Sequence, residues 1–413
     1  MSQYTPEWKV TVNGNTLTNV TLASVNITSG RTNIYEQATA GYASFQLILL
    51  NGQTYALDIN DSVSIQLKDS TGTYVPIFGG FLVESSIEIS SIGQTSYSQK
   101  MNILALGALA RLPRYLTNGV LSKDFEGNQI YSILSSVLFQ TWAEVPAGTT
   151  WADVDSSITW ADAFNAGLGS IDQPGNYEMV ARSSSVIDIY SLIASLATSG
   201  LGYIYEDAQG RISYADSTHR SAYLSANGYF YLSASSDALG SGLRISTRSG
   251  DLRNYITITY KANAQTTASD ATSIQNYGQL AQDISTSLEN AADAVSQAAF
   301  YLTLRANPRG YLEQISFQLA NDAISDADRD ALINVFMGMP VSLSGLPSNM
   351  GSVFEGFIEG WSWQAGYNSL VLTCNLSPLS FSMQAMKWND VSVSESWSTI
   401  TNTLTWEDAL IVN

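Results

Sequence analysis

Alternating apolar and polar positions predict strands in the first part of the chain. Apolar residues alternate with Ser64 and Gln66 over residues 63–67, as in a half-buried strand. The pair Asn13-Gly14 directly follows the apolar segment 10–12, which is the two-residue turn signal of a hairpin. We therefore expect a first β module over residues 1–114.

The middle of the chain changes to helical spacing. Apolar residues three and four apart predict one helix over 125–140 and a second over 187–199 that Gly200 would end. A hairpin is predicted over 203–214, around the turn Asp-Ala-Gln-Gly. These elements indicate a small α/β insertion over residues 115–245.

Strand patterns return in the last third. They are expected at 255–260, 311–319, 341–343, 353–363 and 370–376. A long helix over 288–305, rich in alanine and free of glycine and proline, interrupts them. We assign residues 246–385 to a second β module. The predicted fold class is mainly β, with two similar β-barrel or β-sandwich modules flanking a small α/β domain.

A short sequence match suggests that the two β modules are related. Val-Ser-Ile at 63–65 is followed by a glycine-containing turn and by Phe-Gly-Gly-Phe-Leu at 78–82. Val-Ser-Leu at 341–343 is followed by a similar turn and by Phe-Glu-Gly-Phe-Ile at 354–358. Duplication of one module explains the match, and chance is the alternative because strand sequences use few residue types.

A second repeat consists of tryptophans spaced nine residues apart. Its members are Trp142, Trp151 and Trp160 in the insertion, and Trp388, Trp397 and Trp406 near the end of the chain. One tryptophan can bury roughly 150–250 Å² of surface. Each stretch could therefore strap onto its own domain, and the C-terminal strap (residues 386–413) could instead dock onto a neighbouring subunit or another protein.

Composition and charge narrow the possible functions. Charged residues make up 13% of the chain, about half the usual fraction, whereas aromatics reach 11%. Thirty-six acids against eighteen bases give a formal charge of −18. This balance argues against a protein that grips phosphate backbones, because such affinity comes from Lys and Arg.

Cysteine and histidine chemistry is almost excluded by composition. Cys374 is the single cysteine, so no intrachain disulfide or thiolate metal cluster is possible. His219 is the single histidine, and no Gly-x-Ser-x-Gly segment positions a nucleophile near it, so we interpret it as a polar loop residue. We expect no enzymatic activity and no cofactor.

Three aspartates have the first spacings of a calcium loop. Asp326, Asp328 and Asp330 fit those spacings, but Ala331 replaces the required glycine and Met337 the final glutamate. We interpret them as the acidic start of a helix.

The N-terminus lacks the features of a signal peptide, and no apolar run approaches the ~20 residues of a membrane helix. We expect a soluble protein made in a reducing cytoplasm, with no membrane insertion by this chain.

One predicted strand places acids beside aromatic rings. On a straight strand a single face would carry Glu355, Phe357, Glu359, Trp361 and Trp363. Two acids four residues apart lie about 13 Å apart, which is too wide for either geometry of glycoside hydrolysis. The face could contact a neighbouring subunit, and sugar binding without catalysis is the alternative.

Several segments together resemble a known family, the bacteriophage tail hub proteins of the tail tip or baseplate. They are the strand-and-glycine segment at 75–81, the segment 104–112, the helix at 130–138, the helix and hairpin at 196–214, and the strands at 253–258 and 353–363. Both tryptophan stretches lie outside the general family pattern.

The resemblance implies a structural protein of the virion tail tip. It implies a homotrimer whose two β modules per chain form a ring of six, which would join a sixfold tail tube to threefold distal components. Implied partners are the tail tube, distal tail or fibre proteins and the tape-measure protein, with DNA passing through without specific binding. The alternative class is a receptor- or carbohydrate-binding minor tail protein. A hydrolase is a third class, for which the sequence offers no motif.

Overall fold

The computed structural model describes most of the two β modules and of the insertion. The described residues are 4–18, 20–49, 55–92, 97–114, 116–117, 120–138, 167–234, 243–246, 249–261, 263–308, 310–348, 352–366 and 369–379. The tryptophans of the nine-residue repeat all lie outside these ranges: Trp142, Trp151, Trp160, Trp388, Trp397 and Trp406. The role of both tryptophan stretches therefore stays a prediction.

The first module is a single antiparallel sheet. Its strands are β1 (Trp8–Val12), β2 (Asn15–Thr16), β3 (Val20–Gly30), β4 (Tyr42–Leu49), β5 (Ser62–Lys68), β6 (Tyr74–Ile92) and β7 (Tyr97–Leu106). They pair in the order β3-β4-β7-β6-β5-β1-β2. The predicted hairpin at Asn13-Gly14 is confirmed, because both residues have positive φ (48° and 72°) between the paired strands β1 and β2.

The α/β insertion forms a second core. Its elements are η1 (Ala108–Arg114), β8 (Leu116–Thr117), β9 (Asp124–Phe125), α1 (Glu126–Leu138), β10 (Gly167–Ile171), β11 (Glu178–Met179), β12 (Ile187–Asp188), α2 (Ile189–Ser199), β13 (Tyr203–Glu206), β14 (Arg211–Ala215) and α3 (His219–Asn227). The two predicted helices are confirmed as α1 and α2, and Gly200 is the C-cap of α2. The hairpin β13–β14 is also confirmed.

The second module repeats the large sheet. Its elements are β15 (Phe230–Ser233), β16 (Arg244–Ser246), β20 (Tyr311–Gln318), α6 (Asp326–Ile333), β21 (Pro340–Ser344), β22 (Val353–Gly366) and β23 (Ser369–Pro378). The strands pair in the order β16-β20-β23-β22-β21-β15. Strand β15 and the start of β16 lie in the range 115–245 expected for the insertion, but they pair with strands of the large sheet, so the second module begins before residue 246. The predicted fold class, mainly β with two similar modules around a small α/β part, is confirmed.

The two modules have the same strand order and the same register. The order β3-β4-β7-β6-β5 in the first is matched by β16-β20-β23-β22-β21 in the second. The matched segments of the sequence form equivalent residue pairs across two strands. In the first module Val63 lies opposite Gly80 and Ile65 opposite Phe78. In the second module Val341 lies opposite Gly356 and Leu343 opposite Phe354. The short sequence match thus reflects a shared pairing register.

A β-bulge at the same position strengthens this equivalence. In the pairing of β6 with β7 the register shifts at Val83, between Leu82 and Glu84. In the pairing of β22 with β23 it shifts at Glu359, between Ile358 and Gly360. Each bulge lies five residues after the phenylalanine, Phe78 or Phe354, that begins the second half of the sequence match.

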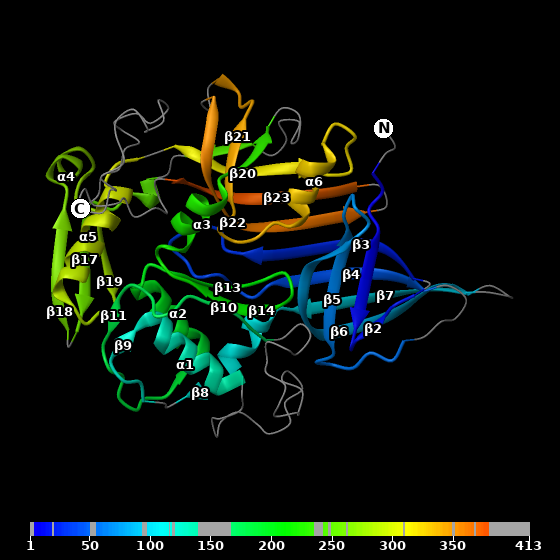
Figure 1. Cartoon of the computed structure of the whole chain (residues 1–413), viewed down its shortest axis with the longest axis horizontal. Coiled ribbons are helices and arrows are strands. Elements are labelled where there is room, and N and C mark those ends of the chain that lie inside the picture. The colour runs from blue at the N-terminus through cyan, green and yellow to red at the C-terminus, as the bar shows by residue number, and fades with distance from the viewer. Residues whose placement is uncertain are drawn as a thin grey trace.

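The two modules join directly into one continuous sheet. Strand β22 pairs antiparallel with β3, from Gly360 opposite Gly30 to Ala365 opposite Val25. In Figure 1, β21 rises steeply from the strands β20, β22 and β23, and β1 and β5 cross β3, β4 and β7 in the same manner. One hydrophobic core, which contains Ile27 and Trp363, extends through both modules.

One segment expected in the second module forms a separate unit. It contains η2 (Ser249–Asp251), β17 (Tyr255–Tyr260), β18 (Ala264–Ser269), α4 (Ala271–Tyr277), β19 (Ala281–Ser285) and α5 (Ala291–Arg305). The strands form their own sheet, β18-β17-β19, whose buried residues Ile256 and Ile258 pack with the core of the insertion. The predicted strand 255–260 is present, but it does not pair with the large sheet.

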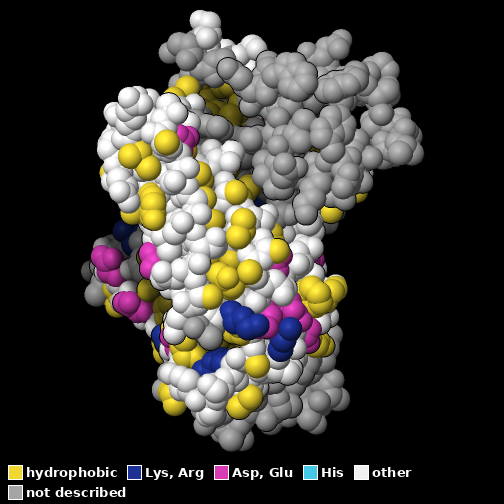
Figure 2. Space-filling view, turned by 90° about the vertical axis from the view of Figure 1, so that its left-hand side faces the viewer, with side chains coloured by type: hydrophobic (Ala, Val, Ile, Leu, Met, Phe, Trp, Pro, Cys, Tyr) yellow, Lys and Arg dark blue, Asp and Glu magenta, His cyan; other side chains and the backbone are white. Residues whose placement is uncertain are grey.

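The surface over this unit is mostly uncharged. Figure 2, which faces the end formed by β17–β19 and α4–α5, shows small groups of hydrophobic side chains among neutral polar atoms. This agrees with the 13% of charged residues in the whole chain. Within the described residues, no helix is both long and apolar enough to cross a membrane.

We predict that the shared core depends on Trp363, which is 1% exposed and lies opposite Ile27 across the joint. Trp363→Ala should lower the free energy of unfolding by about 3–5 kcal/mol, because it removes buried contacts and leaves a cavity. Urea denaturation followed by circular dichroism measures this. Tyr231→Ala, at a tyrosine that is 74% exposed, is the control and should change stability by less than about 0.5 kcal/mol. Equal effects of the two variants would contradict the prediction.

Candidate functional site

The joint between the two modules contains a buried carboxylate. Glu359 is the bulged residue of β22, and its side chain is fully buried. Because a bulge inserts one residue into the strand, it redirects the side chains around it. The carboxylate of Glu359 thus points to groups from other parts of the chain.

Two buried arginines bind this carboxylate. Arg31, directly after β3, donates from Nε to Oε2 of Glu359 at 2.7 Å. Arg220, on α3, donates from Nη1 to Oε1 at 2.6 Å and from Nη2 to Oε2 at 2.7 Å. This two-point contact is the strong geometry for a guanidinium and a carboxylate.

Further residues complete the cluster. Ser377 Oγ, on β23, donates to Oε1 of Glu359. The ring of Tyr203, on β13, lies 4.5 Å from the guanidinium of Arg220 and 5.1 Å from that of Arg31. We call Arg31, Tyr203, Arg220, Glu359 and Ser377 the joint cluster. It connects the first module, the insertion and the second module in one network.

Glu359 stabilises the charges of both arginines, whereas the two arginines repel each other, and burial together with the charge of Arg220 lowers the pKa of Arg31. Burial alone would raise the pKa of the Glu359 carboxyl, but the nearby charges of Arg220 and Arg31 outweigh it and hold this pKa far below its usual range. The group therefore stays ionised at neutral pH. A buried ion pair of this kind is costly to break, since removing one partner leaves the other charged and desolvated.

Close approach of two backbones at the joint requires glycine. Gly30 has φ of +84°, and a Cβ there would lie 2.5 Å from the carbonyl oxygen of Glu359. Gly360, directly opposite, would place a Cβ 2.5 Å from the carbonyl oxygen of Arg31. These glycines let the Arg31 N–H donate to the Glu359 carbonyl at 2.9 Å.

A second, partly buried acid links the insertion to the first module. Glu206, at the end of β13, accepts the backbone N–H of Gly41 at 2.8 Å and that of Leu109. Burial raises the pKa of its carboxyl to about 7.

A third acid lies within the insertion. Glu126 is fully buried and accepts the backbone N–H groups of Asn176 and Tyr177, each at 2.8 Å. Burial raises the pKa of the Glu126 carboxyl to about 7 as well.

The acidic and aromatic residues predicted to share one face of β22 do not do so. The bulge at Glu359 reverses the alternation, so that Trp361 and Trp363 face the shared core, whereas buried Phe357 contacts Arg220. Glu355 is exposed. The buried side chains contact their own chain, and Trp361 and Trp363 form no open platform for a sugar ring.

The pocket beside the joint cluster is small. It has a volume of about 70 Å³, and Arg31, Tyr203, Asp216 and Arg220 are among its lining residues. Small-molecule sites usually occupy about 300–1,000 Å³. The cluster is therefore suited to holding parts of the chain together rather than to binding a ligand.

The other singled-out residues have structural surroundings. His219 is not in a loop, because it begins α3, with Nδ1 2.7 Å from Asp172 Oδ2. Asp326 and Asp328 lie in the first turn of α6, whose N-cap is Ser325, as the helix interpretation predicts. Cys374 is buried in the shared core.

Comparison with known proteins identifies the fold. No family model and no curated protein sequence matches the chain. The structure is similar to the 43 kDa tail protein of prophage MuSo2 from Shewanella oneidensis, with 9% identity, a TM-score of 0.59, and coverage of 91% of this chain and 100% of that one. It is equally similar to the tail protein from Neisseria meningitidis MC58, with 10% identity, a TM-score of 0.59, and coverage of 92% and 98%. The chain therefore has the fold of phage tail proteins.

We predict that Glu359→Gln destabilises the protein strongly. The variant leaves two buried guanidinium groups without their counter-charge, which should lower the free energy of unfolding by about 3–5 kcal/mol. Urea denaturation at neutral pH measures the loss. Glu355→Gln, the same replacement at an exposed position of β22, is the matched control and should change stability by less than about 0.5 kcal/mol. A loss no larger at Glu359 than at Glu355 would rule out a stabilising role.

We predict that Glu206 makes stability decrease between pH 4.5 and pH 7. Because its pKa rises from 4.5 to about 7 on folding, the folded state binds the proton more tightly over that interval. Raising the pH therefore costs up to about 3 kcal/mol of stability.

Glu206→Gln should reduce this pH dependence. Urea midpoints at pH 5 and pH 8 measure it in both proteins, and Glu84→Gln, at an exposed glutamate, controls for the lost charge. An unchanged pH dependence in Glu206→Gln would show that this carboxyl is not responsible.

Proposed function

We propose that the protein is a structural hub of a bacteriophage tail tip or baseplate. In this proposal three copies form a ring of six similar β modules, which joins a sixfold tail tube to threefold distal components. The observation that carries the proposal is the repeat of one module within one chain, with the same strand order, register and bulge.

Symmetry supports this use of a repeated module. A ring forms when identical contacts between neighbours close through a fixed rotation. Two equivalent modules per chain give three chains six equivalent positions around an axis. The direct pairing of β22 with β3 already joins two modules side by side, as neighbours in such a ring must be.

Fold and charge support a place in the tail. The likeness to two phage tail proteins covers more than nine-tenths of this chain. A charge of −18 per chain would repel DNA that passes through a ring, so that DNA would not adhere to it. The partners in this proposal are the tail tube, distal tail or fibre proteins and the tape-measure protein.

A structural role without catalysis also agrees with the site. The Glu359 carboxylate is completely buried and forms ion pairs with two arginines. Such a group holds segments together, whereas a catalytic acid has to reach a substrate and exchange a proton.

We expect the purified full-length chain to form trimers. Native mass spectrometry should give three times the chain mass of 44.6 kDa, and negative-stain images should show threefold rings with a central opening. A protein that stays monomeric at all concentrations, or that forms twofold dimers, would contradict the hub. The alternative predicts monomers that bind cell-wall glycan, which the same preparation can test.

A further inference from the structure

Two edges of the large sheet are open within the described residues. The second half of β6, Glu84–Ile92, pairs with β7 alone, because β5 pairs only with the first half. At the other end of the sheet β16 pairs with β20 alone. An open edge exposes unpaired N–H and C=O groups and can accept a further strand.

These two edges are equivalent to the strands that join the modules within one chain. In the shared strand order, β6 corresponds to β22 and β16 corresponds to β3. Inside the chain the second half of β22 pairs with β3. The open edge of β6 thus corresponds to β22, and the open edge of β16 corresponds to β3, the two strands that already pair within the chain.

We propose that β6 of one copy pairs antiparallel with β16 of the next copy, in the register of β22 and β3. This inference rests on the proposed ring and adds the contact that closes it. The occupant of each edge is therefore a second copy of this chain.

The shared register specifies which residues meet. Gln364 of β22 lies opposite Asn26 of β3. Glu88 is the equivalent of Gln364, because each lies five residues after the bulge of its strand. Arg244 is the equivalent of Asn26, because their partners on the next strand, Gln314 and Ser44, in turn pair with equivalent residues of β23 and β7. Glu88 of one copy should therefore lie opposite Arg244 of its neighbour.

The side chains at these positions are complementary. Glu88 is exposed, and the side chain of Arg244 is 57% exposed beside Glu313, 3.5 Å away in its own chain. Opposite charges directly across two strands stabilise their pairing.

Apolar side chains flank this pair. Ile87 is 54% exposed at the position equivalent to Trp363, which the internal joint buries. Ile245, 37% exposed and next to Arg244, would come close to Ile87 of the neighbour. The contact would thus cover apolar surface that one chain leaves open.

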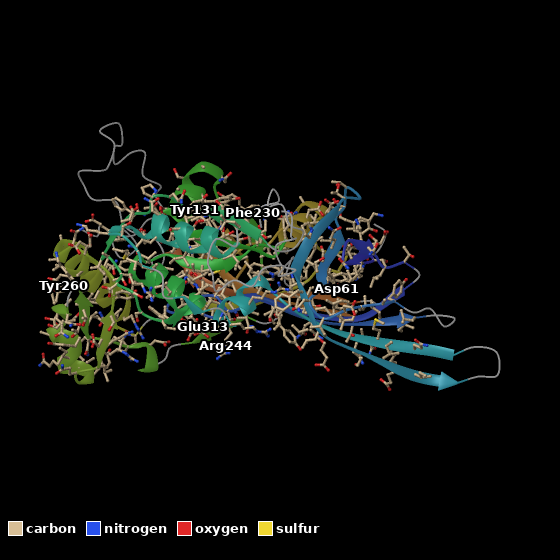
Figure 3. The ribbon with its side chains drawn as sticks, turned by 90° about the horizontal axis from the view of Figure 1, so that it is seen from below. Asp61, Tyr131, Phe230, Arg244, Tyr260 and Glu313 are labelled. Carbon is tan, nitrogen blue, oxygen red and sulfur yellow. The ribbon has the colours of Figure 1, made fainter. Side chains whose placement is uncertain are left out.

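The geometry requires a second copy rather than closure on the same chain. In Figure 3 the β6–β7 hairpin leaves the body at the lower right, whereas Arg244 and Glu313 lie well to the left of it. The contact joins the first module of one copy to the second module of the next, so first and second modules alternate. Such head-to-tail contacts close into a ring when the rotation allows it.

Cysteine crosslinking tests the contact in the full-length chain. Glu88→Cys together with Arg244→Cys should give covalent trimers on mild oxidation, seen on a non-reducing gel, since directly opposed strand residues are within disulfide reach. Cys374 is fully buried and should not react. The control pair, Glu84→Cys with Arg244→Cys, is four residues out of register, about 13 Å away along the strand, and should crosslink at least tenfold less.

A charge exchange tests the same contact without crosslinking. Glu88→Arg alone should weaken trimer formation at least tenfold. Glu88→Arg combined with Arg244→Glu should restore part of it, because Glu88 also lies opposite Lys100 of β7 and Arg244 beside Glu313 in their own chains. All these positions are exposed, so circular dichroism should show an unchanged fold.

The outcomes separate this contact from the proposed function. Trimers that form without a crosslink at Glu88 and Arg244, or that crosslink equally at Glu84, would overturn the contact and leave the hub intact. A chain that never forms trimers would overturn both.

Discussion

The buried carboxylate of Glu359 determines how the three parts of the chain meet. It lies on a bulge of the second module and binds Arg31 next to the first module and Arg220 in the insertion. Its equivalent in the first module is Val83, which carries no charge. The two modules are therefore alike in backbone but differ at this position. The charged residue makes the internal joint stable, because a buried ion pair cannot be broken without a large cost in free energy.

This difference separates a permanent joint from a reversible one. Within the chain, the joint is buried, includes two arginines, and extends the hydrophobic core through Trp363. At the open edges, Glu88 and Arg244 are the exposed equivalents of Gln364 and Asn26. The isoleucines next to them, Ile87 and Ile245, are partly exposed. Exposed ion pairs stabilise weakly, so the contact between copies would depend on several such joints forming together. A protein that has to fold alone and assemble later would need both kinds of joint.

The two related β modules could be predicted from the sequence, whereas the joint cluster around Glu359 could not. The match of 63–82 with 341–358 predicts related modules because strand register constrains which residues are glycine or apolar. Arg31 and Arg220 could not be predicted as partners of Glu359, since they lie 328 and 139 residues away from it along the chain. The bulge itself left no signal, and a straight strand wrongly placed Phe357 and Trp361 on one face. The separate sheet of β17 and β19 was also missed, because their pairing is parallel and spans a helix.

If one joint geometry is used both within and between chains, cryo-electron microscopy of the assembled protein at a resolution that shows strands should reveal it. We expect a threefold ring in which β6 of each copy is hydrogen-bonded to β16 of the next, with Glu88 beside Arg244. An assembly in which these two edges face solvent, or in which the joint between copies differs from the pairing of β22 with β3, would show that the two joints are not alike.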